Sequence, residues 1–375
     1  MSEITMLNYI RMTPEVILNN IDHADAITIQ LVDFYIDNGF DGITVVASGS
    51  SCNGVLCAEE LMRKCFSSVR IVTPYTFIHH RDELGNTMPL FISQSGCSTN
   101  TLEALKHARD KGAKTAALVG RDDCDAARIA ELTVNYGCGE ELIGFVTKGV
   151  TALAAYLMIF SLRIALNTGK MKYQQYLDGL EEMKKAMKLH VEATDRTIEF
   201  FNEHRDDIIG CNKVWYIGSG PALGVASEAA LKTSETSCIP AIAQETEEFL
   251  HGPIYPCDPD SLVVFIDNND HPSSKRVIDS AAAVRTITDS VILISNDASS
   301  PDEITLRLSD QTDYLYAPLY RLAVIQTLSY LRTVSTNNFH PHENLLKFRS
   351  ENKVATKSRK NLYMDLQSMT DKEAK

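Results

Sequence analysis

The sequence predicts an α/β protein with two tandem units, each a doubly wound parallel sheet flanked by helices. Short β-branched runs end in small residues and are followed by segments with helical periodicity, and this pattern occurs in both halves of the chain. The length of 375 residues suits two domains of ordinary size. Apolar residues make up 44% of the chain, which is enough to give each unit a core.

Residues 1–40 are expected to form an N-terminal helical segment. Within it, residues 14–38 have the periodicity of one or two amphipathic helices. Thr13 is a suitable N-cap, Pro14 suits the first helical position, and Gly39 suits the end of the pattern. These signals predict a helix that begins at Pro14.

Strand, turn and helix follow one another three times in residues 41–167, which we predict to form the first domain. The strands and the helices after them are expected at 42–51 and 52–66, at 88–96 and 98–112, and at 114–120 and 121–132. This alternation predicts a parallel sheet with helical crossovers. The most apolar run, 150–159, has about half the length that a bilayer span needs, so we expect a buried helix there.

A polar, charge-alternating segment at 168–205 is predicted to be a helical connector with a solvated face. It precedes the second domain, residues 206–340, which opens with a strand at 213–220 and a helix at 221–237. Residues 341–375 are expected to be a C-terminal tail.

The two domains are expected to be copies of one unit. Gly218 follows Gly49 by 169 residues (218 − 49), and a strand starting at position 290 follows one starting at 115 by 175 residues (290 − 115). Two offsets near half the chain length indicate an internal duplication of a flavodoxin-like, doubly wound domain.

Charge and cysteine spacing limit the partners of the chain. The formal net charge of −13 argues against a nucleic-acid partner. The nine cysteines form no C-x-x-C pair, so they indicate free thiols in a reducing compartment rather than a zinc site. The N-terminus carries Glu3 and Arg11 and lacks the apolar stretch of a signal peptide. We therefore expect a cytoplasmic protein without a membrane partner, a metal or a cofactor.

Two turns rich in serine and glycine, at 47–51 and 93–98, follow predicted strands, where ligands of open parallel sheets bind. Gly49 and Gly96 allow the backbone to approach a ligand closely. The side chains that can donate hydrogen bonds to a phosphate monoester are those of Ser50, Ser51, Ser93, Gln94, Ser95 and Ser98. Serine and glycine are also ordinary turn and N-cap residues, and that alternative stays open. Neither a P-loop nor a G-x-G-x-x-G motif is present, which argues against nucleotide hydrolysis.

These turns resemble those of the sugar isomerase (SIS) family, whose motifs are similar to C-G-T-S and S-Q-S-G-E-T. Here they read S-G-S-S from Ser48 and S-Q-S-G-C-S from Ser93. In the second half, ALKTSETSCIPAIAQETEEFLHGPI (230–254) resembles the A-L-K-x-x-E … E-x-x-H-G-P segment of the isomerase half of glucosamine-6-phosphate synthase and of the Amadori-compound 6-phosphate deglycases. The resemblance covers roughly residues 40–350, both halves and the connector, and implies two tandem SIS domains.

The resemblance also implies roles for single residues. Lys232, Glu235 and His251 match the family's functional positions, with the same spacings of three and sixteen residues. The segment HPHENLLKFRS (340–350) is similar to the synthase's P-R-N-L-A-K segment and places Lys347 on a substrate-binding lysine, which in the synthase is thought to form an imine. In the family the histidine comes from a neighbouring subunit, so a homodimer or larger homo-oligomer with a shared active site is implied. Residues 1–40 are too short to hold a glutamine amidotransferase domain.

Glu228, Lys232 and Glu235 are spaced to share one face of the predicted helix. Without the resemblance, this spacing also suits an ordinary surface ladder of ion pairs, and a lone histidine such as His251 is often structural. With it, Glu235 is the expected base, His251 the acid or base at oxygen, and Lys232 the residue that stabilises negative charge. The phosphate would fix the position of the sugar.

Three functions remain open. The first is a deglycase that cleaves a 6-phosphorylated fructosyl- or glucosyl-amine to hexose 6-phosphate and free amine. The second is an aldose–ketose phosphosugar isomerase, or an aminotransferase or deaminase of amino-sugar phosphates. The third is a phosphosugar sensor without catalysis, against which the Glu235 and His251 pair argues. The acidic residues Glu245, Glu247 and Glu248 either attract a cationic amine or form a solvated loop.

Overall fold

The computed structural model describes residues 5–336, 344–345, 348 and 356–358. The chain divides into two compact units. The first-sheet unit holds Glu15–Val55, Leu61–Leu180 and the described residues of His340–Lys375. The second-sheet unit holds Leu56–Glu60 and the described residues of Met1–Pro14 and Glu181–Phe339.

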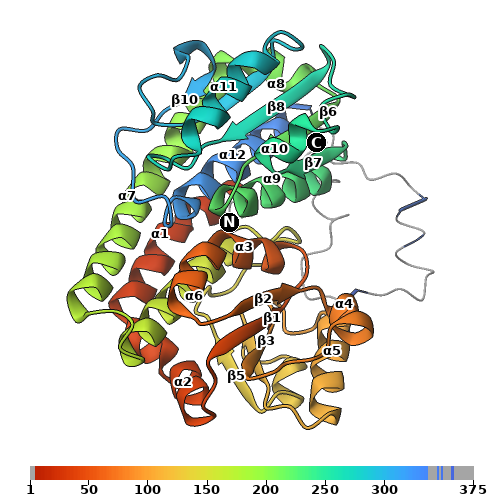
Figure 1. Ribbon diagram of the computed structural model, residues 1–375. Helices are drawn as coiled ribbons and strands as arrows, with labels where there is room; N and C mark the ends of the chain where they lie inside the picture. The colour runs from red at the N-terminus through yellow and green to blue at the C-terminus, as the bar shows by residue number, and fades with distance from the viewer. Residues whose placement is uncertain (1–4, 337–343, 346–347, 349–355, 359–375) are drawn as a thin grey trace. The chain divides into compact units, whose positions relative to one another are not determined.

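The first-sheet unit is built on five parallel strands in the order β2-β1-β3-β4-β5. The strands are β1 (Gly42–Val46), β2 (Val69–Val72), β3 (Thr87–Ser93), β4 (Ala116–Val119) and β5 (Leu132–Asn135) (Figure 1). In the register of the sheet, Val46 pairs with Val72 and Phe91. The carboxyl ends of β1 and β3 are therefore neighbours, as the predicted alternation of strands and helices requires.

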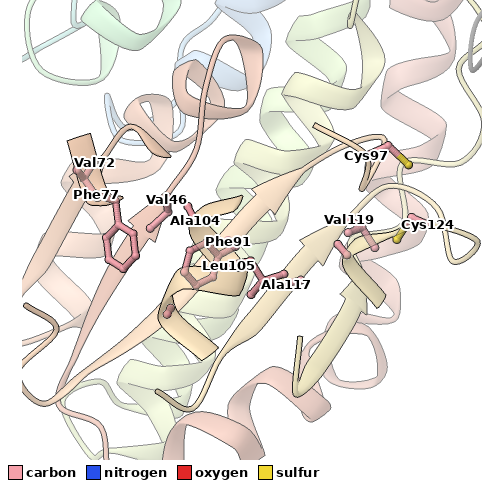
Figure 2. Packing of buried hydrophobic residues seen from close by; sticks show 12 residues of the cluster. Val46, Val72, Phe77, Phe91, Cys97, Ala104, Leu105, Ala117, Val119 and Cys124 are labelled. Carbon is pink, nitrogen blue, oxygen red and sulfur yellow. The ribbon is translucent and has the colours of Figure 1, made fainter. Parts of the chain in front are cut away.

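Helices cover this sheet and bury its β-branched and aromatic residues. They are α2 (Ala24–Asp37), α3 (Ser50–Cys65), α4 (Pro74–His80), α5 (Thr99–Asp110) and α6 (Lys148–Asn167). In Figure 2, Val46 and Phe91 of the sheet lie with Phe77 of α4 and Leu105 of α5 in one apolar cluster. Burial of each such side chain contributes on the order of 2 kcal/mol, so this packing fixes the sheet edge on which the turns lie.

Helix α6 confirms the prediction of a buried helix, but it is longer than the apolar run that predicted it. It is 20 residues long and apolar enough to cross a membrane by length and composition alone, and 89% of its apolar window is buried inside the protein. A core helix passes the same test, because both environments select apolar residues on every face.

Two predictions in the first half are wrong. Helix α1 begins at Met6 and ends at Asp22, so Thr13 and Pro14 lie inside it. The Thr13 hydroxyl donates to the Tyr9 carbonyl within the helix (2.8 Å). Pro14 cannot donate to the carbonyl four residues earlier, and the buried ring of His190 contacts that carbonyl, Ile10 O, through Nε2 at 3.1 Å.

The second wrong prediction is the helix at 121–132. Only a short 3₁₀ turn, η1 (Ala126–Arg128), forms there, and β5 begins four residues after it. The Ala126 amide donates to the Gly96 carbonyl (2.9 Å), so this connection is tied to the serine turn rather than wound into a helix.

The connector at 168–205 is helical over the 31 residues of α7 (Tyr173–Glu203). The second-sheet unit then repeats the strand order of the first. Its strands are β6 (Lys213–Ile217), β7 (Ala241–Gln244), β8 (Ser261–Ile266), β9 (Val291–Ile294) and β10 (Thr305–Leu306). The order β7-β6-β8-β9-β10 is parallel throughout and equals the order of the first sheet counted from its own first strand.

The helices of the second-sheet unit are α8 (Arg205–Gly210), α9 (Pro221–Ser237), α10 (Thr246–Leu250), α11 (Ser274–Val284) and α12 (Pro318–Thr336). A short 3₁₀ turn, η2 (Asp302–Ile304), precedes β10. The predicted helix at 221–237 is confirmed with the same bounds as α9. Gly220, rather than Gly218, is the counterpart of Gly49. Each is the N-cap of the helix after the first strand, with φ and ψ of 57° and −138° at Gly49 and 52° and −132° at Gly220.

Candidate functional site

The two serine turns lie at the carboxyl ends of the adjacent strands β1 and β3. Gly49 is the N-cap of α3, which begins at Ser50 and Ser51. Its φ of 57° lies in the left-handed region that favours glycine, so the turn brings both serines to the start of the helix. Helix N-termini favour negative charge, which suits a phosphate at this edge.

The second turn depends on Gly96 for its shape. Its φ is +61°, and a Cβ at this position would lie 2.4 Å from both Cβ and Sγ of Cys124. Only glycine therefore fits, and the turn delivers Ser98 to the N-cap of α5. Figure 2 shows Cys97 and Cys124 at this edge of the sheet, next to Val119.

The hydroxyl groups of this turn form a connected set. Ser93 donates to Ser98 Oγ at 3.0 Å, and the Cys97 amide donates to Ser95 Oγ at 3.2 Å. Lys357 Nζ donates to Oγ of both Ser95 and Ser98, at 3.1 Å each. The oxygens of Ser95 and Ser98 thus accept two bonds each, so each hydroxyl can bind a further group only by donating its own proton. Hydroxyls in this state suit an acceptor such as a phosphate oxygen.

Lys357 was not predicted. The sequence pointed instead to Lys347, which lies outside the described residues. Lys357 reaches the turn because residues 356–358 pair with it in an antiparallel bridge between Ser98 and Lys357. The partners are 259 and 262 residues apart in the sequence, and the local sequence carries no signal for such a contact.

Gln94 does not join the hydroxyl set. Its Nε2 donates to Glu141 Oε2 at 2.7 Å. Glu141 accepts three backbone amides at the start of α6, those of Thr147 (2.8 Å), Lys148 (3.0 Å) and Gly149 (3.2 Å). Burial raises the pKa of Glu141, and these donors partly oppose that effect by stabilising the carboxylate. Gln94 therefore ties the turn to α6, while its Oε1 has no hydrogen-bond partner among the described residues.

A second tie, also missed at the sequence level, joins the two serine turns to each other. Asn100 Nδ2 donates to Ser48 Oγ at 3.0 Å, and Asn100 Oδ1 accepts the Thr101 amide at 2.8 Å. The side chain of Asn100 thus fixes the separation of the turns.

The second candidate cluster lies on α9 in the second-sheet unit. Lys232 Nζ is 2.5 Å from Glu235 Oε2 and 3.6 Å from Glu228 Oε1. The side chains of Glu228 and Lys232 are 0% and 1% exposed, whereas that of Glu235 is 36% exposed. A surface ladder is therefore the wrong interpretation for this cluster. The buried pair presents one carboxylate, that of Glu235, to the surface of the unit.

His251 lies at the C-terminal end of α10 with an exposed side chain. Within the described part of the chain, its ring has no hydrogen bond or ion pair to Glu235 or Lys232. Two of the nearby acidic residues are already engaged: the carboxylate of Glu245 caps α10, and that of Glu247 pairs with Arg276 at 2.5 Å. These contacts favour a structural role for both.

The second half of the chain is similar in sequence to a known protein family. Residues 207–308, from within α8 to just after β10, match the family model described as SIS domain. This part of the chain is therefore similar to a SIS domain. It is 29% identical over 348 residues to a Thermococcus kodakarensis protein named glutamine–fructose-6-phosphate aminotransferase [isomerizing], covering 89% of this chain and 55% of the relative. A Caulobacter vibrioides protein of the same name is 30% identical, with 77% and 48% covered. The chain thus spans about half the length of these relatives.

Solved structures show the same fold. The C-terminal domain of glucosamine-fructose-6-phosphate aminotransferase from Francisella tularensis superposes with a TM-score of 0.79 at 22% identity, covering 88% of this chain and 96% of that one. Tagatose-6-phosphate ketose/aldose isomerase from Escherichia coli superposes with a TM-score of 0.69 at 17% identity, covering 90% and 96%. Each likeness covers most of the chain, and both show the α/β fold alone, because their sequence identities are low.

Proposed function

We propose that the chain is an enzyme that cleaves a 6-phosphorylated sugar-amine of the Amadori type to hexose 6-phosphate and free amine. The observation that carries the proposal is the cluster on α9. Buried Lys232 lies 2.5 Å from the carboxylate of Glu235, which is half-exposed, and a carboxylate that a ligand can reach is able to act as a general base. The names of the relatives, which refer to fructose 6-phosphate, support a phosphosugar as the ligand.

In the proposed reaction, Glu235 removes a proton from C1 of the ketose-amine, and the electron pair moves through C2 to its oxygen to give the enaminol. Lys232 stabilises the negative charge that develops. Return of the proton at C2 leaves a double bond between C1 and nitrogen. Water adds to C1, the C1–N bond breaks, and the amine leaves with a proton. His251 is the proposed acid and base at oxygen.

Ser50, Ser51, Ser95 and Ser98 are the proposed donors to the phosphate, and Gly49 and Gly96 shape their turns. Ser93 and Gln94 support the second turn through their bonds to Ser98 and Glu141. Phosphate binding remote from the reacting carbon would fix the register of the sugar.

A second candidate is aldose–ketose isomerisation, or amine transfer to the ketose, with the same proton shuttle between C1 and C2. The names of the relatives favour it, because both aminotransferases and a ketose/aldose isomerase occur among them. We also infer that the first-sheet unit is a second SIS domain, since its strand order and its Gly49 turn match those of the second sheet. A cytoplasmic homodimer in which the partner supplies His251 completes the proposal.

The test is to offer the purified chain fructoselysine 6-phosphate, glucoselysine 6-phosphate, and fructose 6-phosphate with ammonia, and to measure amine release and hexose 6-phosphate. Release of lysine that is lost in Glu235→Gln supports the deglycase. The matched control is Glu203→Gln, an exposed glutamate on α7, which should leave turnover unchanged. Conversion of fructose 6-phosphate alone supports the second candidate. Thermal stabilisation by sugar phosphates without turnover would overturn both and indicate a sensor.

A further inference from the structure

Backbone hydrogen bonds of Thr356 and Ser358 hold Lys357, which lies between them, against the second serine turn. The Thr99 amide donates to the Thr356 carbonyl (3.2 Å), and the Ser358 amide donates to the Cys97 carbonyl (2.9 Å). The Ser358 hydroxyl lies 2.6 Å from Asp125 Oδ2, which fixes the residue after the lysine. The backbone is therefore fixed on both sides of Lys357, which restricts where its ammonium group can lie.

The ammonium group lies where it would contact a phosphate bound by the turn. Nζ of Lys357 donates to Ser95 and Ser98 at 3.1 Å, which leaves the protons of both hydroxyls for a ligand. A phosphate that accepts a hydrogen bond from either hydroxyl would be bound to the same serine Oγ atom as Nζ. Two groups bound to one hydroxyl lie within about 5 Å of each other. At such a separation in a half-buried site, a positive charge attracts a dianion strongly.

The rest of the turn is electrically neutral. Its donors are hydroxyls and backbone amides, and among the described residues no other lysine or arginine bonds to Ser93, Ser95 or Ser98. Burial lowers the pKa of Lys357, because the desolvated ammonium loses hydration. An anion at the turn would restore part of that lost stabilisation.

We propose that Lys357 is the specificity-determining residue for the phosphate group, and that its charge selects a phosphomonoester dianion over an unphosphorylated sugar. This inference rests on the proposed function, in which the serine turns bind the phosphate. It assigns recognition of the ligand's negative charge to a residue that is distant in sequence from every motif that predicted the site.

The test compares the full chain with Lys357→Met, which keeps the alkyl length and removes the charge, and with Lys357→Arg, which keeps the charge. The matched control is Lys106→Met, which removes the same charge from an exposed position on α5. Isothermal titration with inorganic phosphate and with fructose 6-phosphate measures Kd for each chain. We expect Lys357→Met to weaken both ligands roughly 10- to 100-fold, as loss of a charge-assisted hydrogen bond does. Lys357→Arg and Lys106→Met should stay within a few-fold of wild type.

In steady-state kinetics, Lys357→Met should raise KM and leave kcat nearly unchanged, since phosphate contacts act on ground and transition states alike. Equal affinity of wild type and Lys357→Met for both ligands overturns the role of Lys357 and leaves the proposed function intact. Borohydride trapping of a hexose phosphate on Lys357 would also overturn it, because the lysine would then lie at the carbonyl end of the sugar. If the wild-type chain binds neither ligand, the proposed function fails as well. A thermal melt of each variant shows whether the fold is retained.

Discussion

Replacement of Lys232 by methionine should destabilise the second-sheet unit, because it removes the positive charge that lies next to the fully buried carboxylate of Glu228. The two charges lie 3.6 Å apart, and their side chains are 0% and 1% exposed. At an effective dielectric constant of about 20, unit charges at that distance attract by about 5 kcal/mol. Breaking a buried pair from one side typically costs about 3–5 kcal/mol. We expect the free energy of unfolding to fall by that amount.

Trp215, the single tryptophan of the chain, makes the measurement selective. It lies buried in β6, so its fluorescence during urea unfolding reports on the second-sheet unit. The matched control is Lys275→Met, which removes a lysine from an exposed pair with Asp279 on α11, where the side chains are 84% and 55% exposed. That change should cost less than about 1 kcal/mol. The double variant Glu228→Gln with Lys232→Met should recover part of the loss, because the buried carboxylate charge is then removed together with the lysine charge that opposed it.

A loss below about 1 kcal/mol in Lys232→Met, equal to that of the exposed control, would refute the reasoning, since the buried pair would then contribute no more than a surface pair. A double variant as unstable as the single one would show that packing of the lysine chain, rather than charge, stabilises the site.

Three further predictions concern the scaffold. Gly96→Ala should lower the calorimetric stability of the first-sheet unit by more than about 1 kcal/mol, because alanine disfavours the positive φ and its Cβ would overlap Cys124; an unchanged melting temperature would contradict this. Glu141→Ala should lower the stability by about 2 kcal/mol in the same assay, since it removes a carboxylate that accepts amides at the start of α6. A change of less than about 0.5 kcal/mol, as expected for an ordinary surface carboxylate, would contradict this. Burial lowers the pKa of His190 below its ordinary 6.5, so the unfolded state takes up a proton first and stability should fall as the pH drops below about 6.5. The pH slope of unfolding should be smaller in His190→Gln, and an identical slope would count against the assignment.

Strands and helices with strong local signals could be predicted from the sequence. The β-branched runs predicted β1, β3, β4, β6 and β9 but not the other five strands. The bounds of α9 were predicted to the residue, because Pro221 suits the first position of a helix. Both serine turns were also placed correctly after their strands. Such features depend on neighbouring residues and on alternation, which a single sequence displays.

Features that depend on distant contacts could not be predicted. Pro14 ordinarily marks the start of a helix, yet α1 continues through it, with His190 contacting the carbonyl that proline leaves without a donor. Lys357 joins the serine turn through a backbone bridge that no periodicity indicates. The burial of Glu228 and Lys232 follows from the packing of α9 against other elements, so the spacing alone could not distinguish a buried pair from a surface ladder.

The duplicated unit suggests how the two halves came to differ in chemistry. Gly96 and Asn269 occupy the same place, three residues after the end of β3 and of β8, and both have positive φ, +61° and +53°. In the first half, glycine leaves the turn open to serine hydroxyls. In the second half, the Asn269 side chain fills it, with Oδ1 2.6 Å from the buried guanidinium of Arg321 and Nδ2 2.8 Å from the Thr312 carbonyl. The Asn269 side chain is therefore engaged within the second unit, whose charged cluster of Lys232 and Glu235 lies on its first helix after a strand, α9. Two turns with a similar backbone conformation thus differ in what fills them: serine hydroxyls surround Gly96, whereas the side chain of Asn269 bonds to Arg321 and Thr312.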